Sequence, residues 1–204
     1  LYLKIRGNLI KKTANHTSMQ NYLFGYGSLI CTVSRNRHTH EAKAIPVRIK
    51  GWQRCWNHRS RSRKRNVLGV YPKEGAVCNG VIFEVKDFTQ LNERENGYSL
   101  VEIDNSSIEA IGKHEIPQAR FWLYVPKESI FPSTEFPIQQ SYLDVVMTGC
   151  LEYGDEFASE LVETTEWSSH WIDDRKEPNY SSYLDNVDSE RIDRLLKALN
   201  FCVP

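Results

Sequence analysis

The sequence predicts an α+β protein built on a small curled or closed sheet of about six strands that is flanked by helices. Segments rich in β-branched and aromatic residues recur up to about residue 125 and are separated by turn residues. So many short strands within 204 residues favour a sheet that curls or closes on itself. Segments with helical spacing of apolar residues lie between and after these strands.

Six segments are expected to form the strands. They are residues 22–26, 44–56, 67–71, 80–85, 98–103 and 119–125. The second segment alternates loosely and contains Gly51, where we expect the strand to bend. Residues 72–75 are rich in turn formers, so they indicate a turn between the third and fourth strands.

The first expected helix is short. Asp87 and Gln90 have the spacing of a capping box, which predicts a helix from there to about Glu95. Phe88, Leu91 and Glu95 then fall on one face of that helix. The carboxylate of Glu95 is therefore expected to point where the apolar side chains point.

Two further helices are expected. Apolar residues at helical spacing run from residue 143 to 151, and Gly154 is a plausible stop. The same spacing recurs from residue 192 to 199, after an N-cap at Asp188 or Ser189.

The chain length fits one domain. We expect a single domain over residues 21–204, with a helical extension from about residue 155. Residues 1–20 contain four Lys or Arg and no acid, so they are expected to be an N-terminal extension outside the ordered domain. No stretch approaches about 20 apolar residues, and no signal-peptide block is present, so the protein is expected to be soluble and cytoplasmic.

No metal site is expected. The five cysteines are scattered without a C-x-x-C pair, which is typical of reduced thiols. His38 and His40 stand two apart on a polar stretch with no third ligand at a suitable spacing. Exposed loop histidines are the favoured interpretation.

Residues 35–65 form a basic segment although the net charge of the chain is zero. This segment holds eleven Lys or Arg and one acid, Glu41. Its densest run, residues 59–65, has no interleaved aromatics on which bases could stack. We interpret the run as a solvated loop or a basic rim that attracts an anionic substrate, in preference to a nucleic-acid site.

Glu95 is the sharpest catalytic candidate. A carboxylate that is taken out of water without a partner has a raised pKa, because burial disfavours the charged form. Such a group can act as a base near neutral pH. The alternatives are that the helix frays at residues 96–97 and exposes Glu95, or that an arginine simply pairs with it.

Residues 25–28 form a glycine turn after the first strand. Glycine lets a chain approach closely, so this turn can lay backbone N–H groups around a carboxylate or an oxyanion. A plain tight turn is an equal alternative. The segment is neither a P-loop nor a nucleophile elbow, and Ser28 is therefore not expected to be a nucleophile.

Two later segments carry weaker signals. Tyr142 lies next to the apolar face of its helix, where it is either a pocket hydroxyl or an ordinary half-buried tyrosine. Residues 173–175 follow Trp167 and Trp171, and could hold a substrate or close a lid. We favour the alternative of a surface ion-pair network over packed indole rings.

Taken together, these motifs resemble the γ-glutamylcyclotransferase superfamily in order and spacing. They are Tyr26-Gly27-Ser28-Leu29, Gly51-Trp52-x-Arg54-x-Trp56, Gly80-Val81-Ile82-Phe83, and Arg94-Glu95 followed by Gly97-Tyr98. The likeness covers about residues 21–155. The Arg-Glu pair with a nearby Gly-Tyr is similar to the glutathione-degrading ChaC branch, which usually has a longer insertion before the Gly-Tyr and a tryptophan and proline after the turn. Here Ile30-Cys31-Thr32 follow instead, and residues 164–180 resemble an extension of a less characterised bacterial-type branch.

The resemblance implies a γ-glutamylcyclotransferase-like fold, a mixed barrel, and a cofactor-independent enzyme that releases 5-oxoproline. It implies a catalytic role for Glu95 and a substrate-binding role for the turn residues Tyr26, Gly27, Ser28 and Leu29. Tyr98 and Tyr142 are implied as further substrate contacts. The implied partner is a small γ-glutamyl compound, whether glutathione, a dipeptide or an amine, bound by a monomer or a homodimer without a metal, a membrane or nucleic acid.

A protein of another class remains the alternative. A binding module could keep the same fold without turnover and use residues 35–65 to hold an anion or RNA. Binding that weakens with salt would favour this alternative, because phosphate contacts release counterions.

Overall fold

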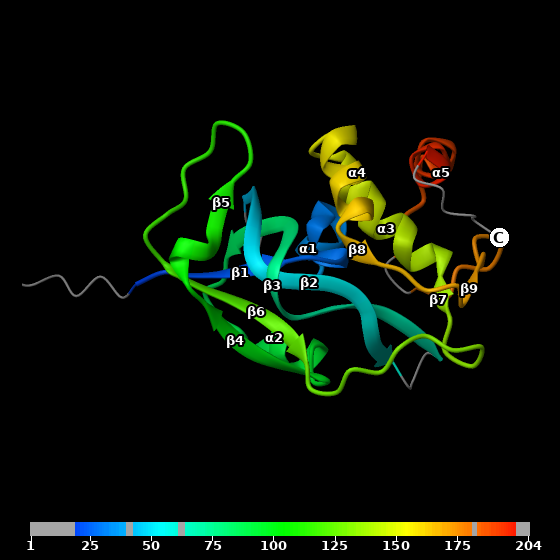
Figure 1. Ribbon diagram of the computed structural model, residues 1–204, viewed down its shortest axis with the longest axis horizontal. Helices are drawn as coiled ribbons and strands as arrows, with labels where there is room; N and C mark the ends of the chain where they lie inside the picture. The colour runs from blue at the N-terminus through cyan, green and yellow to red at the C-terminus, as the bar shows by residue number, and fades with distance from the viewer. Residues whose placement is uncertain (1–18, 40–42, 61–63, 181–182, 199–204) are drawn as a thin grey trace, which may run out of the picture.

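A curved sheet with most of its helices gathered on one side forms the protein (Figure 1). The computed structural model describes residues 19–39, 43–60, 64–180 and 183–198. The strands are β1 (Asn21–Gly25), β2 (Ala44–Ser60), β3 (Arg65–Glu84), β4 (Tyr98–Ile103), β5 (Ile108–Ala110), β6 (Arg120–Pro126), β7 (Ile138–Gln139), β8 (Thr165–Glu166) and β9 (Trp171–Ile172). The helices are α1 (Thr32–Asn36), α2 (Thr89–Arg94), α3 (Gln140–Leu151), α4 (Asp155–Glu163), α5 (Ser189–Ala198) and the 3₁₀ turns η1 (Ser28–Ile30) and η3 (Asn105–Ser107).

Six strands form the main path of the sheet, in the order β4-β6-β1-β3-β2-β5. Strand β1 lies at its centre, parallel to β6 and antiparallel to β3, so the sheet is mixed. The three short strands β7, β8 and β9 attach at its margin. The predicted α+β class, with a curled mixed sheet of about six strands flanked by helices, is confirmed.

The long ribbon of β2 and β3 corrects one prediction. The third and fourth expected strands are one strand, β3, which runs without reversal through residues 72–75. Lys50 of β2 pairs with Val77 of β3, and Trp52 pairs with Pro72. Residues 73–76 of β3 therefore lie opposite Gly51 alone and form a bulge. Gly51 has a φ of 83°, which confirms the predicted bend. Both flanks of the turn-like segment pair with the same partner strand, and this long-range pairing overrides the local turn signal.

Helix α3 packs against the turn that follows β1. Its residues are almost all buried, which goes beyond the single apolar face that the sequence predicted. A Cβ on Gly149 would lie 2.3 Å from the backbone nitrogen of Cys31, so only glycine allows this close approach. The contact holds α3 beside η1 and brings Tyr142 to the glycine turn.

Aspartates accept hydrogen bonds at two of the predicted helix starts. Asp87 Oδ1 accepts hydrogen bonds from the backbone N–H and the hydroxyl of Thr89, at the start of α2. Asp188 Oδ1 accepts from the backbone N–H of Arg191 at the start of α5. Among the helices of the described residues, none is both long and apolar enough to cross a membrane.

Three predictions concern segments that lie wholly or partly outside the described residues. The N-terminal extension 1–20 is described only from Met19, and the basic run 59–65 is interrupted at residues 61–63. His40 lies outside the described residues as well. His38 is half-buried, so the interpretation of an exposed histidine is wrong for this residue.

Candidate active site

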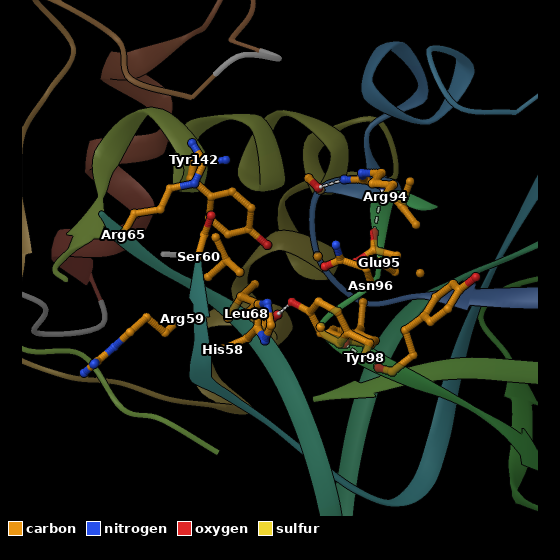
Figure 2. Close-up of a pocket in the computed structure, with 18 of the residues that line it drawn as sticks. His58, Arg59, Ser60, Arg65, Leu68, Arg94, Glu95, Asn96, Tyr98 and Tyr142 are labelled. Carbon is orange, nitrogen blue, oxygen red and sulfur yellow. Dashed lines mark hydrogen bonds and ion pairs between the residues drawn. The ribbon is translucent and has the colours of Figure 1, made fainter. Parts of the chain in front are cut away.

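A cavity of about 860 Å³ opens where β1 ends and α2 meets β4 (Figure 2). All seven residues predicted for the site line it: Tyr26, Gly27, Ser28, Leu29, Glu95, Tyr98 and Tyr142. They come from the β1–η1 turn, the end of α2, the start of β4, and α3. The fold therefore brings segments that are more than one hundred residues apart to one cavity.

Glu95 caps the C-terminal end of α2. Its backbone N–H bonds to Leu91 O at 2.8 Å, and its carbonyl accepts from Tyr98 N at 2.8 Å, so the helix does not fray before Glu95. The Glu95 side chain is 14% exposed. Burial raises the pKa of this carboxyl, and the charge of Arg94 opposes the rise without cancelling it. Glu95 thus combines burial with one cationic neighbour.

Arg94 links the glutamate to the glycine turn. Its Nη1 lies 3.1 Å from Glu95 Oε1, and its Nη2 donates to Ser28 Oγ at 3.0 Å (Figure 2). The pairing that the sequence offered as an alternative to catalysis is therefore present. Because the pKa of Glu95 remains raised, the pairing orients the carboxylate and leaves it usable as a base.

The glycine turn folds into η1 directly after β1. Ile30 N donates to Gly27 O at 2.9 Å, which closes the turn. Within the described residues, the N–H groups of Gly27, Ser28 and Leu29 have no acceptor in the protein, as is usual at the start of a helical turn. A Cβ on Gly27 would lie 2.9 Å from Tyr142 Oη. An alanine here would have to displace the hydroxyl of the tyrosine that packs over the turn.

A buried arginine holds the far side of this turn. Arg35 Nη1 donates to Leu29 O at 3.0 Å and to Ile30 O at 2.8 Å. These bonds occupy the carbonyls of η1 and place a positive charge at its C-terminal end. The free N–H groups at its other end remain available to a ligand. No sequence motif points to Arg35, because its partners are backbone carbonyl groups, which every residue carries.

The tyrosines of the cavity are neutral hydrogen-bonding groups. Tyr26 Oη donates to Tyr124 O at 2.6 Å, and Tyr98 Oη donates to Leu68 O at 3.2 Å. Burial raises the pKa values of Tyr26, Tyr98 and Tyr142 above their usual range. None of the three is therefore suited to act as an anionic base at neutral pH.

Cationic side chains outnumber acidic ones in the cavity lining. Arg59 and Arg65, from the predicted basic rim, lie on the cavity wall with Lys127. His58 stacks on Tyr98 with ring centroids 4.0 Å apart, and burial lowers the pKa of its imidazole. Besides Glu95, Glu128 is the acid that lines the cavity in the described residues. The cavity thus favours a ligand with negative charge.

The structure corrects the interpretation of residues 173–175 as a surface network. Arg175 donates to both carboxylate oxygens of Asp144, at 2.7 and 2.8 Å, and Asp144 is fully buried. Trp167 and Trp171 stack with centroids 5.7 Å apart, so the packed indoles are present. The segment that follows brings Tyr180 into the cavity lining, which the sequence analysis missed.

Metal ligands are not gathered in the described part of the chain. Residues 19–39, 43–60, 64–180 and 183–198 contain no group of three or more His, Cys, Asp or Glu placed to hold a metal ion.

The curled mixed sheet, with a buried glutamate facing a glycine turn, defines a protein of the γ-glutamylcyclotransferase-like fold. A family model described as "ChaC-like protein" matches residues 21–175. That match spans more than half of the sequence, and the chain therefore belongs to the ChaC-like protein family.

Solved structures share this fold at low sequence identity. A gamma-glutamyl cyclotransferase is 16% identical with a TM-score of 0.55, over 87% of this chain and 99% of that chain. An uncharacterized protein from Homo sapiens is 18% identical with a TM-score of 0.53, over 87% and 98%. YkqA from Bacillus subtilis is 18% identical with a TM-score of 0.51, over 71% and 53%. No curated protein matches the sequence.

Proposed function

We propose that this protein is a γ-glutamylcyclotransferase that converts a γ-glutamyl compound into 5-oxoproline and an amine or amino acid. The observation that carries the proposal is the position of Glu95. A buried carboxyl with a raised pKa lines the same cavity as a turn with free N–H groups. Two further observations support the proposal. The chain belongs to the ChaC-like protein family, and its structure is similar to that of a γ-glutamyl cyclotransferase.

The reaction is intramolecular. The free α-amine of the γ-glutamyl group attacks its own γ-carbonyl, a C–N bond forms, and the five-membered lactam closes. The bond between the γ-carbon and the leaving nitrogen then breaks. Holding the chain bent for this attack can supply some of the roughly 7–11 kcal/mol available to well-oriented reactions.

The proton on the α-ammonium has to be removed first. In water, a Glu carboxyl has a pKa of about 4.3 and an α-amine has a pKa of about 7.8. Proton transfer from the ammonium to the carboxylate therefore costs roughly 5 kcal/mol. Burial of Glu95 narrows this gap because it raises the pKa of the carboxyl. Glu95 then gives this proton to the leaving nitrogen. The attacking nitrogen loses a second proton when it becomes the lactam N–H, and Glu95 carries this proton to the released amine, so one residue serves as base and acid.

The glycine turn binds the substrate in this mechanism. The N–H groups of Gly27, Ser28 and Leu29 are placed to bind the α-carboxylate or the oxyanion that forms at the γ-carbon. Tyr98 and Tyr142 line the cavity beside these groups and would contact the bound substrate. Arg94 fixes the Glu95 carboxylate toward the turn through its bond to Ser28.

The test is 5-oxoproline release from glutathione, γ-glutamyl amino acids and γ-glutamylamines. Wild type should form product from at least one of these substrates, and Glu95→Gln should form none while it stays folded by circular dichroism. Glu93→Gln is the matched control, because Glu93 lies exposed on the same helix. Turnover by Glu95→Gln would remove Glu95 from the mechanism, and a folded wild type without product would contradict the enzyme itself.

A second candidate is favoured by the cationic lining. A binding module on the same fold would use Arg59, Arg65 and Lys127 to hold an anion or RNA. Its signature is polyanion binding that weakens steeply with salt and does not depend on Glu95. Binding lost in Lys127→Gln but kept in Glu95→Gln, in a protein without turnover, would identify this function.

A further inference from the structure

Tyr180 lies in the cavity wall although it belongs to a segment beyond the residues that the family model matches. Its side chain is buried. Its ring meets the Tyr142 ring edge-on, with centroids 5.0 Å apart and an interplanar angle of 86°. The guanidinium of Arg65 covers the Tyr180 ring at 4.6 Å from its centroid. Tyr180 therefore joins a tyrosine of α3 to a cation of β3.

One carboxylate fixes this segment to the start of α3. Asp174 accepts hydrogen bonds from the backbone N–H of Ser141 at 2.7 Å and from its hydroxyl at 2.6 Å. Asp174 Oδ2 also accepts from Asn179 N at 3.0 Å. Tyr180 N donates in turn to Ser141 Oγ at 3.2 Å. Because Ser141 immediately precedes Tyr142, Asp174 sets the positions of both tyrosines.

A cluster of ion pairs also attaches this segment to the helices α3 and α5. Arg175 joins the buried Asp144 of α3 to Asp193 of α5, with bonds of 2.7 to 3.1 Å. Arg65 Nη1 donates to the Asn179 carbonyl at 3.2 Å. A wall held by this many bonds keeps its shape when a ligand arrives, as a specificity element requires.

The reaction geometry decides what this wall can contact. Glu95 and the glycine turn occupy the end where the γ-glutamyl group has to react. Figure 2 shows Tyr142 and Arg65, the two partners of Tyr180, on a different side of the cavity from Glu95 and Asn96. The leaving nitrogen has to lie within reach of Glu95 to receive its proton, so the part of the leaving group beyond that nitrogen is the part that can reach this wall.

We propose that Tyr180, stacked under Arg65, forms the wall that selects the leaving group, and that Asp174 is the positioning residue that holds it. The inference rests on the function proposed above. It extends the site to the segment 173–180, of which residues 176–180 lie beyond the family match.

The test compares two γ-glutamyl compounds, one with a methylamine leaving group and one with phenylalanine. Tyr180→Ala should raise the KM of the phenylalanine compound relative to the methylamide by about tenfold, the usual scale for a lost pocket contact, with little change in kcat. Tyr180→Phe keeps the ring and should retain the wild-type ratio. Where Tyr180→Ala does not fold, Tyr180→Leu gives the same comparison.

Asp174 is tested against its neighbour in sequence. Asp174→Asn weakens the attachment to Ser141, so the KM ratio should move in the same direction as in Tyr180→Ala while kcat is kept. Asp173→Asn is the matched control, because the Asp173 carboxylate accepts from Arg175 N within its own turn. The control should keep the wild-type ratio. An equal change of the KM ratio in Asp174→Asn and Asp173→Asn would show that Asp174 does not position the wall.

Affinity measurements separate this inference from the proposed function. Calorimetric titration of both compounds in the Glu95→Gln background measures binding without turnover. If Tyr180→Ala selectively loses affinity for the phenylalanine compound while the wild type forms no product, the specificity wall is retained and the proposed enzymatic function is rejected. Turnover by wild type with an unchanged KM ratio in Tyr180→Ala would reject the wall alone. A wild type that binds neither compound would reject both.

Discussion

At the scale of single residues, the site depends on the balance between burial and one neighbouring charge. Burial raises the pKa of Glu95, and Arg94 at 3.1 Å lowers it. A carboxylate without Arg94 would stay protonated over more of the pH range, and one in water would be too weak a base. The Arg94–Glu95 pair therefore sets the pH range in which the proposed base is ionised.

Replacing Arg94 tests this balance. In Arg94→Met the cation that lowers the Glu95 pKa is gone, so the pKa rises and the base is ionised only at higher pH. The acid limb of the kcat/KM profile should move to higher pH, and activity at neutral pH should fall. Arg94→Lys keeps the charge and should move the limb less. An acid limb that stays in place in Arg94→Met would show that Arg94 does not tune Glu95.

Gly27 gives a second prediction at this scale. A Cβ here would lie 2.9 Å from Tyr142 Oη, so Gly27→Ala should lower the free energy of unfolding by about 1–3 kcal/mol and reduce activity. Chemical denaturation measures the first effect. Tyr142→Phe removes the clashing oxygen, so the double variant should recover most of the lost stability, and strictly additive effects would contradict the contact.

At the scale of elements, the close approach of α3 to the turn after η1 decides where the site residues meet. The helix α3 could be predicted from the sequence because its apolar residues recur at helical spacing, although its burial extends beyond that face. The continuity of β3 was not readable. Local turn formers at residues 72–75 compete there with pairing to β2, and the pairing prevails because it continues on both sides of the bulge.

Gly149 tests the approach of α3. Its Cβ would lie 2.3 Å from Cys31 N, a backbone atom that cannot rotate away. Gly149→Ala should therefore destabilise the protein by about 1–3 kcal/mol or more and displace η1, so that activity falls too. Thr148→Ala, one position earlier on α3, is the control. Equal unfolding midpoints for the two variants would contradict a tight contact.

At the scale of the whole molecule, a neutral chain concentrates positive charge at its cavity. The net charge is zero, yet Arg59, Arg65 and Lys127 share the lining. The sequence alone indicated that positive charge is unevenly distributed along the chain. Folding of β2, β3 and the loop after β6 around one cavity turns it into an asymmetry in space.

Salt dependence tests this charge distribution. Raising ionic strength shortens the Debye length from about 10 Å at 0.1 M to about 3 Å at 1 M, which screens exposed charges. The KM for γ-glutamylglutamate, whose leaving group carries two carboxylates, should rise more than that for γ-glutamylmethylamide. Lys127→Gln should reduce the difference, whereas Lys86→Gln, exposed and outside the lining, should not. Equal salt effects on both compounds would contradict the attraction.

The sequence by itself determined the features that rest on local physics: most segments of the main strands and of the helices α2, α3 and α5, the glycine turn after β1, and the apolar face that carries Glu95. These follow from periodicity, capping and backbone freedom, which act over a few residues. Only the tertiary structure decided that Arg94 bonds to Ser28, that Arg35 holds the carbonyls of η1, and that Tyr180 joins the cavity. Each of these joins groups by hydrogen bonds or ring contacts whose partners are set by packing, and no local pattern in the chain encodes which distant atom a side chain will meet.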